Sequence, residues 1–331
     1  MASFRALVID KAHDGVAVAI RDWSTDRLMD GEVTIRVEYS SVNYKDGLAA
    51  ISDGRVVRSY PLILGVDVAG TVVASTDERH ATGDKVIAHG YEIGVAHHGG
   101  FAELARVPAA WAVPLPAGLT TRQAMTLGTA GFTAALSVAR LEAAGLAPHA
   151  GTVIVTGSSG GVGSTAVDIL AARGYTVAAS TGSTDAHDFL RDLGATEILD
   201  RAETSAESGR PLERPRWAGA IDAVGGPTFA YLLRTMEYGA SIAISGNTGG
   251  APYASTVFPF ILRAANVLGI DSVALPLNRR IEIWQRLATD LRPPHLDTTI
   301  AHEVSLDETP DQLTAILRGA TRGRTIVRIS N

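Results

Sequence analysis

The sequence predicts an α/β protein with two domains, a β-rich domain followed by a doubly wound parallel sheet. The chain has 331 residues, more than a single hydrophobic core ordinarily serves. Up to about residue 125, short strand-like runs alternate with Gly and Pro turns. From Thr152 the pattern becomes strand, glycine turn and helix, repeated, which is typical of a parallel sheet.

The first part of the chain shows period-two alternation of apolar residues. It predicts strands in "EVTIRVEYS", "GVDVAGTVV", "GDKVIAHG" and "GGFAELARVP". Helical spacing follows in "LPAGLTTRQAMTLGTAGFTAALSVARL", with an interruption near Gly128 and Gly131. We place the boundary there, so that residues 1–125 and 273–331 form the first domain and residues 126–272 the second. The strand-like tail "GRTIVRIS" is expected to return to the first domain.

The second part alternates strand and helix patterns. Strands are predicted in "GTVIVTG", "YTVAAS", "ATEILD", "GAIDAVGG", "GASIAISG" and "NVLGIDSV". Helices are predicted after the glycine turn, in "TDAHDFLRDLG" and in "NRRIEIWQRLATDL", and "RAETSAESGRPLERPR" is predicted as a polar loop.

Composition narrows the class of protein. The 46% hydrophobic and 19% charged content is that of a soluble globular protein. A net charge of −6 argues against a nucleic-acid partner, which requires a basic face. No run approaches the ~18 apolar residues that a membrane span needs. "MASFRALVID" enters a strand-like pattern without the features of a signal peptide, so we expect no membrane partner and a cytoplasmic location.

The chain contains no cysteine, which excludes disulfides and every metal site built on thiolates. His97 and His98 stand side by side in "AHHGGF", but adjacent histidines are poor chelators without further ligands. We expect no metal.

The glycine turn "VTGSSGGVG" is the sharpest motif. It follows an apolar strand and precedes a helix, the context that makes such a turn specific for a dinucleotide. Glycines let the backbone approach a pyrophosphate, and the helix N-terminus offers unpaired N–H groups. A glycine-rich turn without a ligand is the alternative. We predict that the turn, including Gly163, binds a dinucleotide.

The end of the next strand indicates which dinucleotide is bound. An NAD site usually presents Asp or Glu there for the ribose 2′-hydroxyl. Here "YTVAAS" is followed by Thr181, Gly182, Ser183 and Thr184, with no acid until Asp185. These hydroxyls, and Arg201 just after the third strand, suit a 2′-phosphate and predict NADP(H). The alternative for Arg201 is an exposed loop charge.

A polar cluster in "SSVNYKDGLAA" follows a predicted strand directly. Asn43, Tyr44 and Asp46 either line a reaction pocket or cap a turn or short helix, the commonest role of Asn and Asp. We interpret the segment as the floor of the nicotinamide pocket, because no other concentrated polar set occurs in the chain.

Taken together, these motifs resemble the zinc-independent YhdH/AcuI-type acrylyl-CoA reductases, also called quinone oxidoreductases, of the medium-chain dehydrogenase/reductase superfamily. The resemblance covers nearly the whole chain through "SSVNYKDGLA", "LGVDVAGTV", "GTAGFTA", "VTGSSGGVGSTAV", "RPLERPRWAGAIDAVGG", "PFILR", "GIDSV" and "GRTIVRI". Val66 and Asp67 stand where zinc-dependent members carry His and Glu. The resemblance implies a GroES-like catalytic domain plus a Rossmann domain, usually in a homodimer.

The family's NADPH contacts carry over motif by motif. They fall on Tyr44, Ser159, Gly160, Gly161, Val162, Thr181, Gly182, Ser183, Arg201, Asn247, Ile261, Ser272 and Arg324. Two positions depart from the pattern. Ser183 stands where an Arg is common, and Asn247 replaces a more apolar residue. The first departure leaves Arg201 and the hydroxyls to hold the 2′-phosphate and weakens the expected preference for NADPH over NADH.

The activity implied is NADPH-dependent reduction of an activated C=C bond, most simply acrylyl-CoA to propanoyl-CoA. Asn43 and Tyr44 would supply hydrogen-bond donors for the enolate oxygen, and Asp46 would orient its neighbours. Candidates for the CoA phosphates are Lys45, Arg55, Arg58 and Arg263. Reduction of quinones or free alkenals is the nearest alternative substrate assignment. A non-catalytic NADPH-binding sensor is the alternative from another class.

Overall fold

The computed structural model describes residues 3–298 and 301–330, which fold into two compact units. The first unit comprises the described residues up to Thr129, Val273–Thr289 and those from Ala301 onward. The second comprises Ala130–Ser272 and the described residues from Asp290 to 298. The sequence assigned everything after residue 272 to the first domain. The segment that begins at Asp290 instead belongs to the second unit. Within that unit, His295 contacts the buried carboxylate of Asp168 through its backbone N–H at 3.0 Å and through its ring Nδ1 at 2.8 Å.

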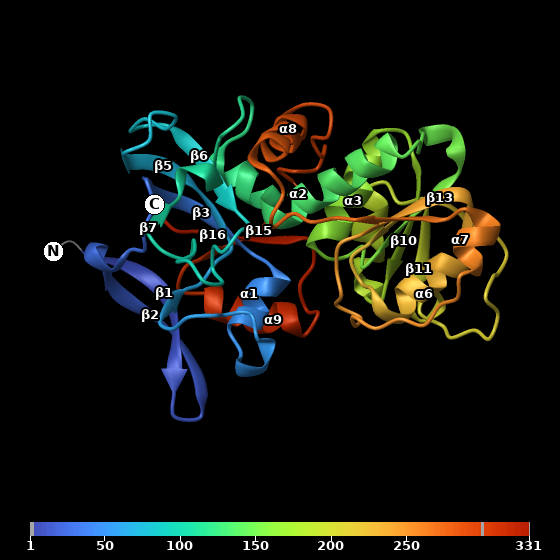
Figure 1. Ribbon diagram of the computed structural model, residues 1–331, viewed down its shortest axis with the longest axis horizontal. Coiled ribbons are helices and arrows are strands. Elements are labelled where there is room, and N and C mark those ends of the chain that lie inside the picture. The colour runs from blue at the N-terminus through green and yellow to red at the C-terminus, as the bar shows by residue number, and fades with distance from the viewer. Residues whose placement is uncertain (1–2, 299–300, 331) are drawn as a thin grey trace. The chain divides into compact units, whose positions relative to one another are not determined.

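The first unit is built from two sheets together with helices α1, α8 and α9 (Figure 1). One sheet has the order β2-β1-β4; the other has seven strands, ordered β15-β16-β3-β5-β6-β8 with β7 also paired to β3. Strand β16 pairs with β3 and β15, so the predicted return of the tail is confirmed. The elements are β1 (Ser3–Ala12), β2 (Gly15–Ser24), β3 (Val33–Val42), α1 (Tyr44–Ala49), β4 (Leu62–Ile63), β5 (Asp67–Ser75), β6 (Lys85–His89), β7 (Leu104–Val107), β8 (Ala112–Pro114), α8 (Leu277–Ala288), β15 (Ala301–Ser305), α9 (Thr309–Leu317) and β16 (Arg324–Arg328).

The second unit is the predicted doubly wound sheet. Its six strands have the order β11-β10-β9-β12-β13-β14, and every neighbouring pair is parallel. Helix α3 packs on β9 and β10, and α6 packs on β12 and β13 (Figure 1). The elements are β9 (Thr152–Thr156), α3 (Gly161–Ala172), β10 (Thr176–Thr181), α4 (His187–Asp192), β11 (Glu197–Asp200), α5 (Arg201–Thr204), β12 (Trp217–Asp222), α6 (Gly226–Thr235), β13 (Met236–Ile244), α7 (Phe258–Arg263) and β14 (Asn266–Gly269). The strand order reverses between β9 and β12, the position at which such sheets bind dinucleotides.

The predicted polar loop from Arg201 to Arg216 is wrong at its start. Residues Arg201–Thr204 form helix α5, because the carboxylate of Asp200 accepts the N–H of Ala202 at 2.7 Å and caps the first turn. The rest of the segment has no regular structure before β12.

Helix α2 (Thr121–Ala143) is broken at Gly128, where the sequence predicted an interruption. The φ and ψ of Gly128 are 52° and −159°, a conformation essentially restricted to glycine. A Cβ there would lie 2.5 Å from Ser41 Oγ and 2.6 Å from Asp67 Oδ2. The break also frees the N–H of Thr129, which donates to Asp67 at 3.0 Å.

We expect Gly128→Ala to lower the free energy of unfolding by roughly 3 kcal/mol, since backbone strain adds to displacement of buried polar groups. Gly145→Ala is the matched control. Its φ is +99° but a Cβ there meets nothing within 4 Å, so it should cost only about 1–2 kcal/mol of strain. Urea unfolding of both variants measures the difference, and equal losses would contradict a role for the contacts of Gly128.

Candidate active site

The predicted polar corner joins β3 to α1. Asn43 precedes the helix, and Asp46 lies in its first turn, fully buried. Asp46 Oδ2 accepts the backbone N–H of Asn43 at 2.8 Å, and Oδ1 accepts that of Val66 at 2.9 Å. The carboxylate therefore caps the helix start, as the capping interpretation expects.

The side-chain amide of Asn43 is turned into the protein. Its Nδ2 donates to Asp67 Oδ2 at 2.8 Å and to the Ser41 carbonyl at 3.2 Å, while its Oδ1 accepts from Arg324 Nη1 at 3.2 Å. An amide nitrogen carries two hydrogens, so both are engaged. Asn43 thus has no free donor for a substrate oxygen in this arrangement. Half-buried Tyr44 differs, because its hydroxyl has no hydrogen-bond partner among the described residues.

Arg324 is the cation of this cluster. It is 2% exposed, and its guanidinium donates to the carbonyls of Thr126 and Val42 at 3.1 Å each and to Ser41 Oγ at 2.7 Å. Its Nη2 lies 3.8 Å from Asp67 Oδ2. With the bond to the Asn43 side-chain oxygen, four of its five N–H groups are used within the protein.

Two carboxylates and one guanidinium share this buried volume. Burial, followed by repulsion from Asp67, raises the pKa of Asp46 to about 7. Burial lowers the pKa of Arg324, while attraction to Asp67 and Asp46 opposes that change. The cluster can therefore change charge near neutral pH.

The cluster continues to a buried histidine. Thr129 Oγ1 donates to Asp67 Oδ1 at 2.5 Å and lies 3.4 Å from His89 Nδ1. Trp284 Nε1 donates to His89 Nε2 at 3.0 Å, and Arg280 Nη1 lies 3.0 Å from the ring. Burial, then the charge of Arg280, lowers the pKa of His89 well below its usual range, so the imidazole is neutral at pH 7.

The glycine turn of the second unit has the geometry of an anion site. A Cβ on Gly163 would lie 2.4 Å from the Gly157 carbonyl oxygen, so only glycine lets α3 start this close to the turn. Ser158 donates to the Ser180 carbonyl through its N–H at 3.0 Å and its Oγ at 2.6 Å, fixing the turn on β10. The N–H groups of Gly161, Val162 and Gly163 begin the helix and have no intrahelical acceptor. These groups fit a pyrophosphate.

Hydroxyls and a cation gather where β9 and β10 end. Thr181 Oγ1 donates to Ser159 Oγ at 3.0 Å and accepts the N–H of Ser183 at 3.1 Å. A Cβ on Gly182 would lie 2.6 Å from the guanidinium carbon of exposed Arg201, so the arginine lies directly over this glycine. The guanidinium has no partner among the described residues. The set fits a ribose 2′-phosphate.

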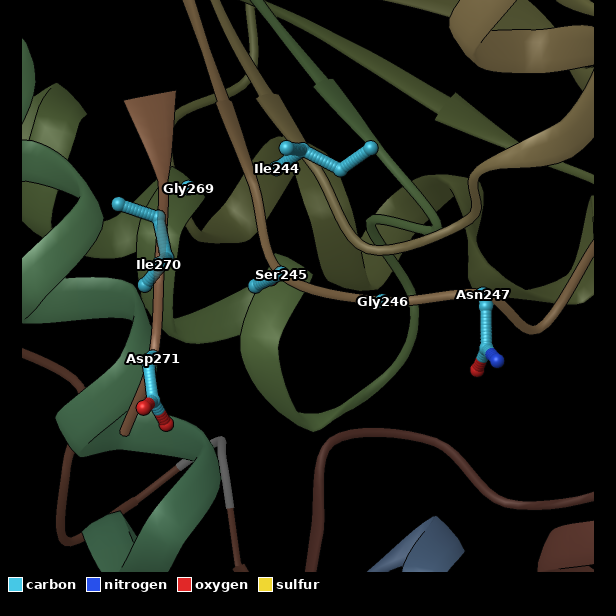
Figure 2. Close-up of a pocket in the computed structure, with 7 residues that line it drawn as sticks. All are labelled: Ile244, Ser245, Gly246, Asn247, Gly269, Ile270 and Asp271. Atoms are coloured by element: carbon cyan, nitrogen blue, oxygen red, sulfur yellow. The ribbon is translucent and has the colours of Figure 1, made fainter. Parts of the chain in front are cut away.

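A hollow of about 630 Å³ lies at the ends of β13 and β14 (Figure 2). Its lining is Ile244, Ser245, Gly246, Asn247, Gly269, Ile270 and Asp271. Asn247 is thus on the same strand-end edge of the sheet as the glycine turn, and Ser272 comes directly after the lining in the chain. Ile261 is not part of the lining; it lies on α7 with 66% of its surface exposed.

Two of the four cations proposed for a CoA phosphate already have protein partners. Arg263 donates to the carbonyls of Arg234 at 2.7 Å, Met236 at 3.0 Å and Glu213, which assigns it to holding the chain. Arg58 pairs with Glu92 at 3.0 Å on the surface. Lys45 and Arg55 have no partner among the described residues.

The residues present do not fit zinc. His97 Nε2 lies 2.7 Å from the Arg106 carbonyl, and His98 contacts the Ile63 N–H and the Arg27 carbonyl. Within residues 3–298 and 301–330, no three His, Cys, Asp or Glu side chains form a group able to hold a metal ion.

In the same ranges no helix combines the length and apolarity required to cross a bilayer.

The sequence did not single out Ser41, Asp67 or Thr129 as site residues. Asp67 offered one signal, a charged residue inside the apolar run "LGVDVAGTV". Ser41 and Thr129 offered none, because their contacts with Asp67 join segments far apart in the chain.

Comparisons with known proteins agree with this architecture. Residues 29–117 match the alcohol dehydrogenase GroES-like domain, and residues 161–289 match the zinc-binding dehydrogenase family. The chain is 51% identical to YhfP of Bacillus subtilis (strain 168), covering 98% of this chain and 99% of that protein. It is 49% identical to acrylyl-CoA reductase AcuI of Ruegeria pomeroyi, covering 99% of each.

Two solved structures are close in fold. The yhdH oxidoreductase from Salmonella enterica in complex with NADP has a TM-score of 0.96 at 46% identity, covering 98% of this chain and 100% of that one. Bacillus subtilis yhfP with NAD bound has a TM-score of 0.96 at 50% identity, covering 99% and 100%. A GroES-like unit and a Rossmann unit in one chain define a medium-chain dehydrogenase/reductase. Within that superfamily, the chain belongs to the family of YhfP, YhdH and AcuI.

The raised pKa of Asp46 predicts pH-dependent stability. Native Asp46 keeps its proton up to about pH 7, whereas the unfolded carboxyl loses it near its ordinary pKa of 3.8. Its contribution to the free energy of unfolding is full below the unfolded pKa and is lost as pH rises to about 7, by up to roughly 4 kcal/mol. Asp46→Asn removes this part of the slope. Urea unfolding of both proteins across that range checks it, and parallel curves would contradict it.

Proposed function

We propose that the chain reduces the activated C=C bond of an enoyl-CoA thioester with NADPH, with acrylyl-CoA as the simplest substrate. The observation that carries the proposal is the 49% identity to acrylyl-CoA reductase AcuI over 99% of both chains. The open hydroxyl of Tyr44 and the anion-binding groups of the glycine turn support it.

When bound, NADPH supplies a hydride to the β-carbon of the substrate. The electron pair of the double bond then moves toward the thioester oxygen, and the α-carbon takes up a proton. Tyr44 is the donor of the corner that is open to the developing oxyanion, and one such donor is worth about 3 kcal/mol. Asn43 and Asp46 act on this reaction by holding the corner.

The cofactor preference is assigned to the cluster at the end of β10. Arg201 over Gly182 and the hydroxyl of Ser159, to which Thr181 donates, provide a cation and a donor for a 2′-phosphate. The relatives were crystallised with different dinucleotides, yhdH with NADP and yhfP with NAD. Because Arg201 can pair with the 2′-phosphate that NAD lacks, we assign NADP(H) to this chain, with Arg201 as the side chain that discriminates between the two dinucleotides.

A second copy of the chain is the proposed partner. Helix α7 and edge strand β14 expose a group of apolar side chains in the second unit: Val257, Phe258, Phe260, Ile261, Leu262 and Val267. Edge strands and apolar patches of this kind are usually covered in assemblies. We assign this surface to a homodimer, and we place the working enzyme in the cytoplasm.

The activity is tested by following NADPH at 340 nm with acrylyl-CoA, crotonyl-CoA, a free alkenal and a benzoquinone. We expect kcat/KM for acrylyl-CoA to exceed that for the quinone by at least about tenfold, because the chain matches acrylyl-CoA reductase AcuI over its whole length. The name of YhfP places it among quinone oxidoreductases, so a faster quinone reaction would transfer the assignment to that class. Tight NADPH binding without turnover of any acceptor would indicate a non-catalytic sensor.

Arg201→Ala tests the cofactor assignment. Loss of a charge-assisted contact should lower kcat/KM for NADPH by roughly 10- to 100-fold and leave NADH within about threefold. Arg191→Ala is the control, since Arg191 is exposed and pairs only with Asp188 on α4 among the described residues. Equal losses with both dinucleotides would remove Arg201 from the 2′-phosphate site.

A further inference from the structure

Asp67 begins β5 and is fully buried, yet it is a carboxylate. Its oxygens accept from Ser41 Oγ at 2.5 Å, from Asn43 Nδ2 at 2.8 Å and from Thr129 through Oγ1 at 2.5 Å and N at 3.0 Å. The charge of Arg324 lies 3.8 Å away. Residues from β3, the following corner, the broken helix α2 and β16 therefore all converge on one side chain.

Holding strands together does not require this charge. Buried ion pairs replaced by apolar side chains of similar volume often leave stability unchanged or improved. The carboxylate has a role that an apolar residue cannot fill, because it sets the direction of the Asn43 amide. Asp67 accepts from Nδ2 of this amide, and Arg324 donates to its Oδ1. If the amide were rotated by half a turn, its oxygen would face the carboxylate and its N–H groups would face the guanidinium.

The direction of the Asn43 amide bears on the reaction because Asn43 immediately precedes the open donor. Asn43 is the residue before α1, and Tyr44 is the first residue of that helix. Asp46 also contacts the Asn43 side chain, because Asp46 Oδ2 lies 3.4 Å from Asn43 Nδ2. The amide is thus held between two carboxylates and a guanidinium, and its neighbour carries the hydroxyl that is open to a ligand.

We propose that Asp67 is a positioning residue for the reduction, acting through the Asn43 amide to fix the corner that presents Tyr44. The inference rests on the proposed function, since it concerns the rate of that reaction. Asp67 itself does not contact the substrate. Its effect on the corner passes through the bond to Asn43, which makes the two residues energetically coupled.

The charged groups around the corner give this coupling a signature in pH. Two charged groups face Asp46: Asp67, which begins β5, and Arg324, which lies on β16. His89 and Arg280 lie beyond Thr129, on the far side of Asp67. Removing the negative charge of Asp67 removes a repulsion and leaves Arg324 in place. Ionisation of Asp46 then becomes easier and its pKa falls.

The test is a double-mutant cycle of Asp67→Asn and Asn43→Ala, read as kcat with saturating NADPH and the acceptor that the wild type turns over fastest. We expect each single variant to lose about tenfold or more, and the double variant to lose no more than the worse single variant. The pH titration of Asp46, followed by carboxyl-carbon NMR in the unliganded protein, should move down by about one unit or more in Asp67→Asn.

Asp168→Asn is the matched control, because it also exchanges a buried carboxylate for an amide but in the second unit. It should leave the titration of Asp46 and the turnover unchanged. Should Asp67→Asn fail to fold, Thr129→Val removes one donor to Asp67 while keeping its N–H, and a smaller loss of kcat that vanishes in the Asn43→Ala background is expected.

Additive losses in the cycle, or an unchanged Asp46 titration in folded Asp67→Asn, would overturn the positioning role. A wild type that turns over no acceptor would instead remove the proposed function, and the NMR titration would still report whether Asp67 governs the charge state of Asp46.

Discussion

The carboxylate of Asp67 is the interaction on which the polar centre of the first unit depends. Buried hydroxyls, an amide and a guanidinium each lose water on folding and need partners inside the protein. Asp67 supplies an acceptor to Ser41, Asn43 and Thr129 together and a countercharge to Arg324. Without it, Arg324 would depend on Asp46 for its negative charge, and the break of α2 at Gly128 would lose the acceptor for the N–H it exposes.

The two units differ in how many hydrogen-bond donors they leave open at their sites. In the first, buried carboxylates are satisfied by the protein's own donors, so the cluster is closed and rigid and offers few open polar groups. In the second, donors are left unused: the first N–H groups of α3 and the guanidinium of Arg201 have no acceptor within the described part of the chain. A polar network saturated from within suits positioning, whereas unsatisfied donors suit capture of an anionic ligand.

Most of the architecture follows from local patterns. The alternation in "EVTIRVEYS" predicted β3 because Val33, Ile35 and Val37 point into one core, and the strand and helix around the glycine turn identified the dinucleotide unit. The sequence did not predict helix α5, because the four residues that follow its cap Asp200 are too few to show a helical periodicity.

The function of the corner could not be read locally for a different reason. Asn43 and Asp46 are residue types suited equally to capping and to catalysis, and only their partners decide between the two roles. The partners of Asn43 include Asp67 and Arg324, which are 24 and 281 positions away along the chain, and no spacing rule connects them.

The place of β16 in the sheet has a consequence for biosynthesis. This strand lies between β15 and β3 and brings Arg324 to Asp67, yet the ribosome makes it after every strand of the Rossmann unit. The nascent chain therefore holds a complete parallel sheet while the catalytic unit still lacks an inner strand and its buried cation. Completion of the polar cluster around Asp67 is therefore a late event of synthesis, and a translation product that stopped short of β16 would contain every strand of the second unit but would leave Asp67 without the guanidinium of Arg324.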